Sequence, residues 1–309
     1  DLPQGQQFTR TDLPVMAVSP DGKQFVYATP EGLYLRSTVE LTAKLIAGTE
    51  GQAGNPFFSP DGKSIAYYSL SDRKLKKIAV TGGAPVALCD FKAMAFVGGH
   101  WNVDNTIIFG QAPGPIMRVS ANGGTPEAIT ENAAAHVFPQ ILPGGKYLMY
   151  TALPNPRIVV QSLKSGEIKE LFAGGDARYL PTGHIVHRLW ENNDNLFAVP
   201  FDLDRLEATG GAVPVVEGIL QYAVSDAGTL VCIPGTARTS SSGALTLVWV
   251  NRDGKEEPLG APLDQYLFPR ISPDGKLATF TIAGDNADIW VRDLVRGTMT
   301  RLTFDKGND

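Results

Sequence analysis

The sequence predicts an all-β protein, a β-propeller built from four-stranded antiparallel blades, most simply seven of them, with six or eight as the alternatives. Three observations support this fold class. One turn motif recurs about every 40 residues, short apolar stretches rich in β-favouring residues flank each copy, and no stretch has a long helical period with caps. The 33 glycines and 22 prolines among 309 residues supply the many turns that such a fold needs.

The recurring motif is clearest at residues 55–69, which read NPFFSPDGKSIAYYS. Pro60 has φ fixed near the value required at the second position of a type I turn, and Gly62 can adopt a positive φ without a Cβ penalty. This combination predicts a three-residue hairpin, in which a type I turn is followed by a left-handed residue. The aromatic and β-branched residues on both sides of the turn favour strands.

Seven copies of this turn are present along the chain. Residues 17–29 and 270–282 keep the SPDGK sequence, and the four copies between residues 100 and 234 are degenerate. Asparagine, which replaces glycine once, is the residue that best tolerates the left-handed region. A third strand, a glycine-containing turn and a short fourth strand are expected to complete each unit. The predicted left-handed positions are Gly22, Gly62, Asn105, Gly145, Gly183, Gly228 and Gly275.

Packing between units is expected because a single four-stranded sheet cannot bury both of its faces. The residue before the first position of each turn is large and apolar in every copy, and we expect this column to fill the gaps between blades near the axis. Its members are Val18, Phe58, Trp101, Ile141, Tyr179, Val224 and Ile271. Repeats let a core grow unit by unit, so we predict one propeller domain over residues 14–309 after a lead-in segment at 1–13.

Composition excludes several classes of function. The net charge is −5 and the only basic cluster, residues 72–77, alternates with apolar residues, so a nucleic-acid partner is not expected. No apolar run has the length of a membrane span, and membrane insertion by this chain is not expected. Cys89 and Cys232 fall in different units among apolar neighbours, which predicts two buried free thiols.

No catalytic or metal-binding pattern is present. His184 and His187 are three residues apart on a predicted strand, where side chains alternate between faces, so the pair does not predict a metal site. The acidic stretches 191–195, 201–205 and 284–288 lack calcium-loop spacing, and no G-x-S-x-G motif is found. The sequence therefore predicts a protein that is not an enzyme and has no cofactor.

One column of residues, two positions before the serine of the SPDG motif, contains both polar and apolar side chains. Its members are Ala17, Phe57, His100, Gln140, Arg178, Ala223 and Arg270. One hypothesis is that His100, Gln140, Arg178 and Arg270 line a central funnel and bind an anionic ligand, because a guanidinium group can clamp a carboxylate or phosphate.

The alternative for this column is structural. The polar side chains would then only solvate the channel and cap neighbouring carbonyl groups, while Arg178 and Arg270 would pair with Asp176 and Asp264. Under the ligand hypothesis, aromatic contacts to the ligand would come from Tyr179, Trp190 and Tyr222; under the structural alternative these side chains pack, which is the commoner role for such residues.

The motifs SPDGK, DIWVRDL (288–294) and RLTFD (301–305) resemble the TolB-like and WD-repeat-like propeller repeats of bacterial proteins, over nearly the whole chain. The phrases at 200–218 and 288–309 are similar to the C-terminal propeller region of bacterial serine/threonine protein kinases. This resemblance implies an extracytoplasmic, periplasmic location, with the cytoplasm as the alternative, and it brings no catalytic residues.

The sequence therefore predicts a recognition domain that binds a protein or a small anionic ligand, as the sensor or interaction domain of a receptor-type kinase. Two alternatives stay open: a TolB-like periplasmic scaffold, and the gating propeller of a prolyl-oligopeptidase-like hydrolase, which would need a separate hydrolase domain.

Overall fold

The computed structural model describes residues 6, 8, 13–40, 42–51, 53–131, 134–189, 195–234, 247–250, 256–259, 266–282 and 288–304. These residues form antiparallel strands and turns and no helix, which confirms the all-β prediction. Trp190 and Asp264, as well as most of the acidic stretches 191–195 and 284–288, lie outside the described residues.

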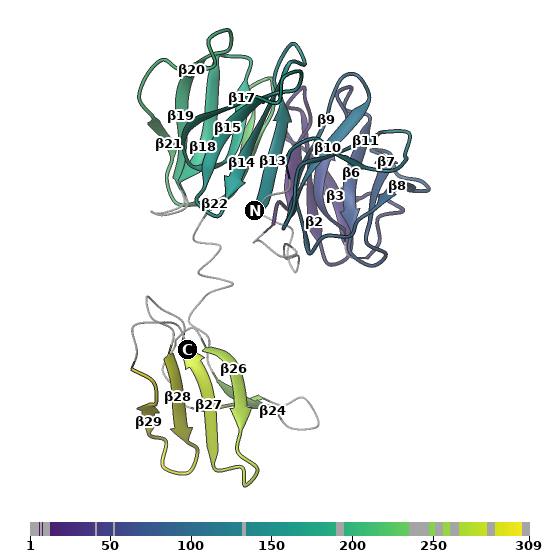
Figure 1. Ribbon diagram of the computed structural model, residues 1–309. Coiled ribbons are helices and arrows are strands. Elements are labelled where there is room, and N and C mark those ends of the chain that lie inside the picture. The colour runs from purple at the N-terminus through teal and green to yellow at the C-terminus, as the bar shows by residue number, and fades with distance from the viewer. Residues whose placement is uncertain are drawn as a thin grey trace. The chain divides into compact units, whose positions relative to one another are not determined.

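The chain divides into two compact units, Asp1–Pro234 and Gly235–Asp309 (Figure 1). Among the described residues, the first unit contains four four-stranded repeats, one five-stranded repeat and one two-stranded repeat, and the second contains one four-stranded and one two-stranded sheet. The single propeller domain over residues 14–309 and the number of blades both stay predictions.

The first three repeats follow the expected strand order, from an inner strand to an outer one. Repeat 1 contains β1 (Met16–Val18), β2 (Gln24–Thr29), β3 (Gly32–Ser37) and β4 (Ala43–Leu45). Repeat 2 contains β5 (Ala53–Phe58), β6 (Ser64–Ser69), β7 (Lys74–Ala79) and β8 (Val86–Asp90). Repeat 3 contains β9 (Ala95–Trp101), β10 (Thr106–Ala112), β11 (Met117–Ser120) and β12 (Glu127–Ala128).

The next three repeats complete the first unit. Repeat 4 contains β13 (Ala135–Ile141), β14 (Tyr147–Leu153), β15 (Arg157–Ser162) and β16 (Ile168–Ala173). Repeat 5 contains β17 (Gly175–Leu180), β18 (His184–Leu189), β19 (Asn195–Asp202), a short β20 (Glu207–Ala208) and β21 (Val213–Val216). Repeat 6 contains β22 (Ile219–Val224) and β23 (Leu230–Pro234) in this unit.

The second unit contains the remaining strands. A two-stranded sheet is formed by β24 (Val248–Val250) and β25 (Glu256–Pro258). The seventh copy of the motif forms a four-stranded sheet from β26 (Tyr266–Ile271), β27 (Leu277–Ile282), β28 (Asp288–Asp293) and β29 (Met299–Arg301).

The turn prediction is confirmed at all seven positions. Each predicted left-handed residue has a positive φ, from 66° at Asn105 to 86° at Gly228. Each also donates its N–H to the carbonyl three residues earlier, as Gly62 does to Ser59 at 2.9 Å. The Ser59 hydroxyl closes the loop, because it donates to Asp61 Oδ1 at 2.6 Å and accepts from Ser64 N at 2.9 Å.

A second regular feature was not predicted. The inner strands of repeats 2 to 5 contain a β-bulge, where the pairing register with the second strand shifts. A left-handed residue lies at the equivalent position in each, with φ of 51° at Asn55, 79° at Gly98, 53° at Phe138 and 52° at Asp176. A bulge bends the strand and redirects the neighbouring side chains, and bulges are frequent beside functional sites.

Side-chain amides join the inner strands of neighbouring repeats. Gln140 pairs with the backbone of Tyr179, since Tyr179 N donates to Oε1 at 2.7 Å and Nε2 donates to the Tyr179 carbonyl at 3.1 Å. Gln221 accepts from Val15 N at 2.9 Å and donates to the carbonyl of Leu13. The inner strand of the sixth repeat therefore lies beside the inner strand of the first.

The apolar column is buried or half-buried in the first unit. Val18, Phe58, Trp101 and Tyr179 are buried, and Ile141 and Val224 are half-buried. In one interface the cluster is continuous from Phe57 of the second repeat to Trp101 of the third. The prediction is wrong for Ile271, which is 54% exposed in the second unit; among the described strands of that unit, no second four-stranded sheet covers it.

The prediction for the cysteines is half right. Both thiols are free, and Cys89 is buried between repeats. Cys232 is exposed instead. It lies on β23, which pairs only with β22 among the described strands, so no third strand in that sheet covers it.

Candidate functional site

His100 lies near the end of the inner strand β9, paired with Ile108. Its side chain is half-buried. The pKa of His100 is lowered to about 4, chiefly by burial and also by the positive charge of Arg178, while the charge of Asp104 acts in the opposite direction. The imidazole is therefore neutral at physiological pH, and it lies within electrostatic range of an arginine two repeats away.

Gln140 lies on β13, at the equivalent position of the fourth repeat. Both ends of its amide are bonded to the backbone of Tyr179 on β17. This is the role that the structural alternative proposed, the capping of a neighbouring backbone. A part for Gln140 in ligand binding stays a prediction.

Arg178 lies on β17, and its side chain is half-buried. Its Nη1 donates to three carbonyls at long distances, 3.4 Å to Phe138, 3.5 Å to Pro139 and 3.3 Å to Ala177. No carboxylate in the described part of the chain lies within the 4.0 Å of an ion pair from this guanidinium, so the expected pairing with Asp176 is absent. Among the described residues, the hydrogen bonds of this guanidinium group all go to backbone carbonyls.

Asp176 precedes Arg178 by two residues and occupies the bulge. Its N–H donates to Thr151 Oγ1 at 3.1 Å, and its carbonyl accepts a short hydrogen bond from the Tyr222 hydroxyl. Burial raises the pKa of the Asp176 carboxyl, although the nearby charges of Arg178 and Arg188 oppose the shift. Burial raises the pKa of Tyr222 as well, and the Asp176 charge adds to that rise.

His100, Asp176, Arg178 and Tyr222 form a group that we name the axial cluster. It joins the inner strands of the third, fifth and sixth repeats. The sequence placed His100 and Arg178 in one column of candidate residues, but it treated Asp176 only as a partner for the arginine and Tyr222 only as an aromatic contact. The bulge column two residues upstream, in which Asn55, Asp176 and Gln221 are polar, was the signal that would have identified Asp176.

Arg270 lies on β26 in the second unit, and it is exposed. The described contact of its guanidinium is a hydrogen bond from Nη1 to the carbonyl of Pro269 at 3.1 Å. Its convergence with His100, Gln140 and Arg178 stays a prediction.

The other two candidate groups behave as the structural alternatives expected. His184 bonds to Thr182 at the turn, while His187 is 2% exposed and packs against Phe172 and Phe197. The two imidazoles therefore do not form a pair. Within the described ranges, no group of three or more histidine, cysteine or acidic side chains is placed to hold a metal ion.

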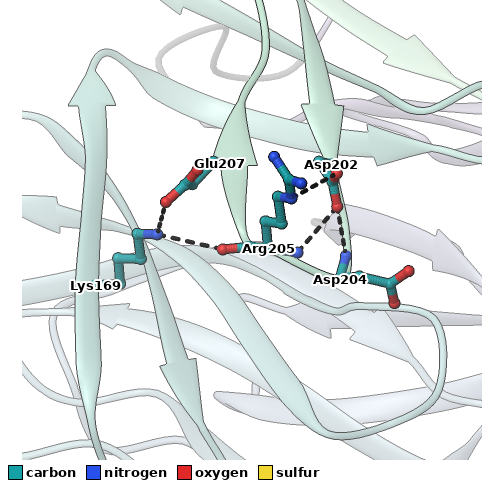
Figure 2. Close-up of polar contacts among 5 residues, drawn as sticks. All are labelled: Lys169, Asp202, Asp204, Arg205 and Glu207. Atoms are coloured by element: carbon teal, nitrogen blue, oxygen red, sulfur yellow. Dashed lines mark hydrogen bonds and ion pairs between the residues drawn. The ribbon is translucent and has the colours of Figure 1, made fainter.

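The acidic stretch 201–205 lies at the end of β19 and in the turn that leads to β20, within the fifth repeat (Figure 2). Asp202 accepts hydrogen bonds from the N–H groups of Asp204 and Arg205, both at 2.9 Å. Lys169 of the fourth repeat reaches across to the Arg205 carbonyl at 3.3 Å and to Glu207 Oε1 at 3.1 Å. The Asp202 carboxylate is thus engaged by the backbone, and the stretch serves to fix the turn.

Comparisons with known proteins identify the fold. No protein-family model matches the chain, and no curated protein matches it. The chain is similar in structure to a putative TolB from Agrobacterium tumefaciens, with a TM-score of 0.58, 15% identity, and coverage of 71% of this chain and 88% of that one.

Two further structures agree. TolB from Acinetobacter baumannii has a TM-score of 0.53 and 19% identity, and the match covers 66% of this chain and 54% of that one. A chain of a nidogen/laminin complex has a TM-score of 0.52 and 12% identity, and the match covers 63% of this chain and 77% of that one. The fold is a TolB-like β-propeller. In the part of the chain that is described, no helix is long and apolar enough to cross a membrane.

Proposed function

We propose that the chain is a non-catalytic interaction propeller that binds a protein partner at the axial ends of its inner strands. The observation that carries this proposal is Arg178, a half-buried guanidinium group held by carbonyls at 3.3–3.5 Å and lacking a carboxylate partner among the described residues. An arginine in this state has already lost much of its hydration, so an incoming anionic group gains a strong charge-assisted bond. The TolB-like fold supports a role as a protein-interaction scaffold.

The contacts of the first unit support a ring of six repeats, which the sequence left open beside seven. Gln221 bonds to the backbone of Leu13 and Val15, and Tyr222 bonds to the carbonyls of Asp176 and Val186. The sixth inner strand is thereby bonded to both the fifth and the first repeat. In this proposal the binding surface is complete within residues 13–234.

The finer assignment is to the extracytoplasmic sensor region of a bacterial receptor-type serine/threonine kinase. It is favoured by the phrases at 200–218 and 288–309, which are similar to those kinase propellers. In that setting, partner binding by the ring would be coupled to the catalytic domain, and the chain would function in the periplasm.

Photo-cross-linking tests the proposed function. A photoreactive amino acid is placed at Ala223, in the mixed column of β22, and at Val39, which is 90% exposed on a turn of the first repeat. In cells of the source organism we expect the Ala223 probe to form an adduct with one protein, and the purified partner should compete with this adduct. Adducts that form from Val39 and not from Ala223 would contradict an axial binding surface.

A further inference from the structure

Two columns of side chains, two residues apart, lie on the inner strands of the first unit, and most of their polar members are engaged between repeats. Asn55 accepts from Gly98 N at 3.4 Å, Gln140 pairs with Tyr179, and Gln221 pairs with the first repeat. These amides have a structural task, because each one satisfies backbone groups of the adjacent inner strand.

Asp176 and Arg178 occupy the same two columns on β17. Arg178 shares this task only through Nη1, which donates to the carbonyls of Phe138 and Pro139 on β13, while its Nε and Nη2 and the Asp176 carboxylate have no described partner. No hydrogen bond or ion pair of the Asp176 carboxylate is present among the described residues, and the guanidinium contacts only carbonyls, all through Nη1. The two groups influence each other electrostatically, yet no ion pair within 4.0 Å joins them. A carboxyl group and a guanidinium group are thus held near each other without a direct ion pair between them.

The backbone holds this pair in place from both sides. Asp176 has a φ of 52°, and its N–H and carbonyl are bonded to Thr151 of the fourth repeat and Tyr222 of the sixth. A residue held in the left-handed region by two neighbouring repeats costs conformational energy, and such residues are concentrated at binding sites. Both side chains are half-buried, so they are partly desolvated and still reach solvent.

We propose that Asp176 and Arg178 bind a ligand that carries a carboxylate beside an N–H donor, the pattern of a peptide C-terminus or of a free amino acid. The ligand carboxylate would accept from Nε and Nη2 of Arg178, which have no described partner and can bind both oxygens of a carboxylate. The ligand N–H would donate to the Asp176 carboxylate. This inference rests on the proposed function, because it names the chemical group that the axial surface recognises.

A binding experiment with the full chain tests this directly. The probes are a hexapeptide library with free C-terminal carboxylates, the same library as C-terminal amides, and a mixture of free amino acids, with bound species measured by affinity selection and mass spectrometry. We expect the free-acid peptides or the amino acids to bind, and the amides to bind at least tenfold more weakly, since a lost charge-assisted bond costs about that factor or more.

Variants then assign the contacts. Arg178→Gln should weaken binding of the selected acid at least tenfold, and Asp176→Asn should weaken it severalfold while asparagine keeps the left-handed backbone. Arg157→Gln is the matched control, since Arg157 is 44% exposed and already paired with Glu170, and it should leave binding unchanged. Circular dichroism verifies that each variant is folded.

Three results would overturn the inference: equal binding of acids and amides, no binding by any probe, or unchanged affinity in the Arg178→Gln variant. The proposed function fails separately. If the Ala223 probe captures a partner whose binding does not depend on a free carboxylate, the proposed interaction function is supported and the proposed carboxylate site is contradicted. If peptides bind and free amino acids do not, the ligand is a chain terminus; the reverse result identifies a small-molecule ligand, and both support the site.

Discussion

Acid should destabilise the first unit through His100. Its pKa is about 4 in the folded chain and 6.5 as the ordinary value, so the unfolded chain takes up a proton on this residue at a higher pH than the folded chain does. The contribution of His100 to the free energy of unfolding is therefore fully present above pH 6.5 and is lost as the pH falls toward 4. Between pH 7.5 and pH 5 the loss from this one residue is about 2 kcal/mol, and below pH 4 it reaches about 3 kcal/mol.

Two measurements check this expectation. The His100 ring proton, followed by NMR, should titrate with a midpoint near 4. Urea unfolding of the wild type and of His100→Gln at pH 7.5 and pH 5 should show about 2 kcal/mol less acid destabilisation in the variant. The comparison of variants is needed because burial also lowers the pKa of His136 and His187. Removal of the Arg178 charge should raise the midpoint, but only in part, since burial is the larger cause. A midpoint near 6.5, or equal acid sensitivity in both chains, would refute the reasoning.

Four more expectations follow from the structure. Gly62→Val should cost about 1–3 kcal/mol, because valine resists a φ of 69° although the site has room for a Cβ, and a melting curve like that of the wild type would show that the turn is not strained. Gln221→Leu should lower the free energy of unfolding by about 2–3 kcal/mol, because it leaves the Val15 N–H and the Leu13 carbonyl unpaired. Urea unfolding measures this loss, with Gln24→Leu at a half-buried position as the control; equal effects of the two variants would argue against a ring bonded at this point. Arg178→Ala should abolish partner binding, and Arg270→Ala tests the sequence prediction that the second arginine contributes, with unchanged affinity as the contrary result. The purified chain should hydrolyse no peptide, simple ester or lactone, and turnover that persists through repurification would contradict a binding role.

The turn pattern made most of the fold predictable. Ser, Pro, Asp and Gly impose a particular hairpin by local sterics and hydrogen bonding, so all seven left-handed positions were found without long-range information. The bulges were not predictable in the same way. Phe138 has a positive φ although its residue type does not favour one, and the backbones of Phe138 and Asp176 are bonded to neighbouring repeats, which a linear pattern does not reveal.

The candidate site was half predictable for a related reason. Alignment of the repeats placed His100 and Arg178 in one column, and the structure brings them within electrostatic range. The sequence could not distinguish Gln140, whose amide is used between repeats, from Asp176, whose carboxylate is not. That distinction depends on side-chain contacts between neighbouring inner strands, which a linear pattern does not reveal. Cys232 shows the same limit, since its exposure depends on whether its sheet has a third strand.

Hydrogen–deuterium exchange of the full chain, with and without its cross-linked partner, tests the axial binding surface most directly. We expect the partner to slow exchange at the inner strands around residues 138–140, 176–178 and 221–223, where the axial cluster and its neighbours lie. Exchange at the outer strands β4, β8 and β16 should stay as it is in the free chain. Protection confined to those outer strands, with the inner strands unchanged, would contradict a propeller that binds its partner at the axis.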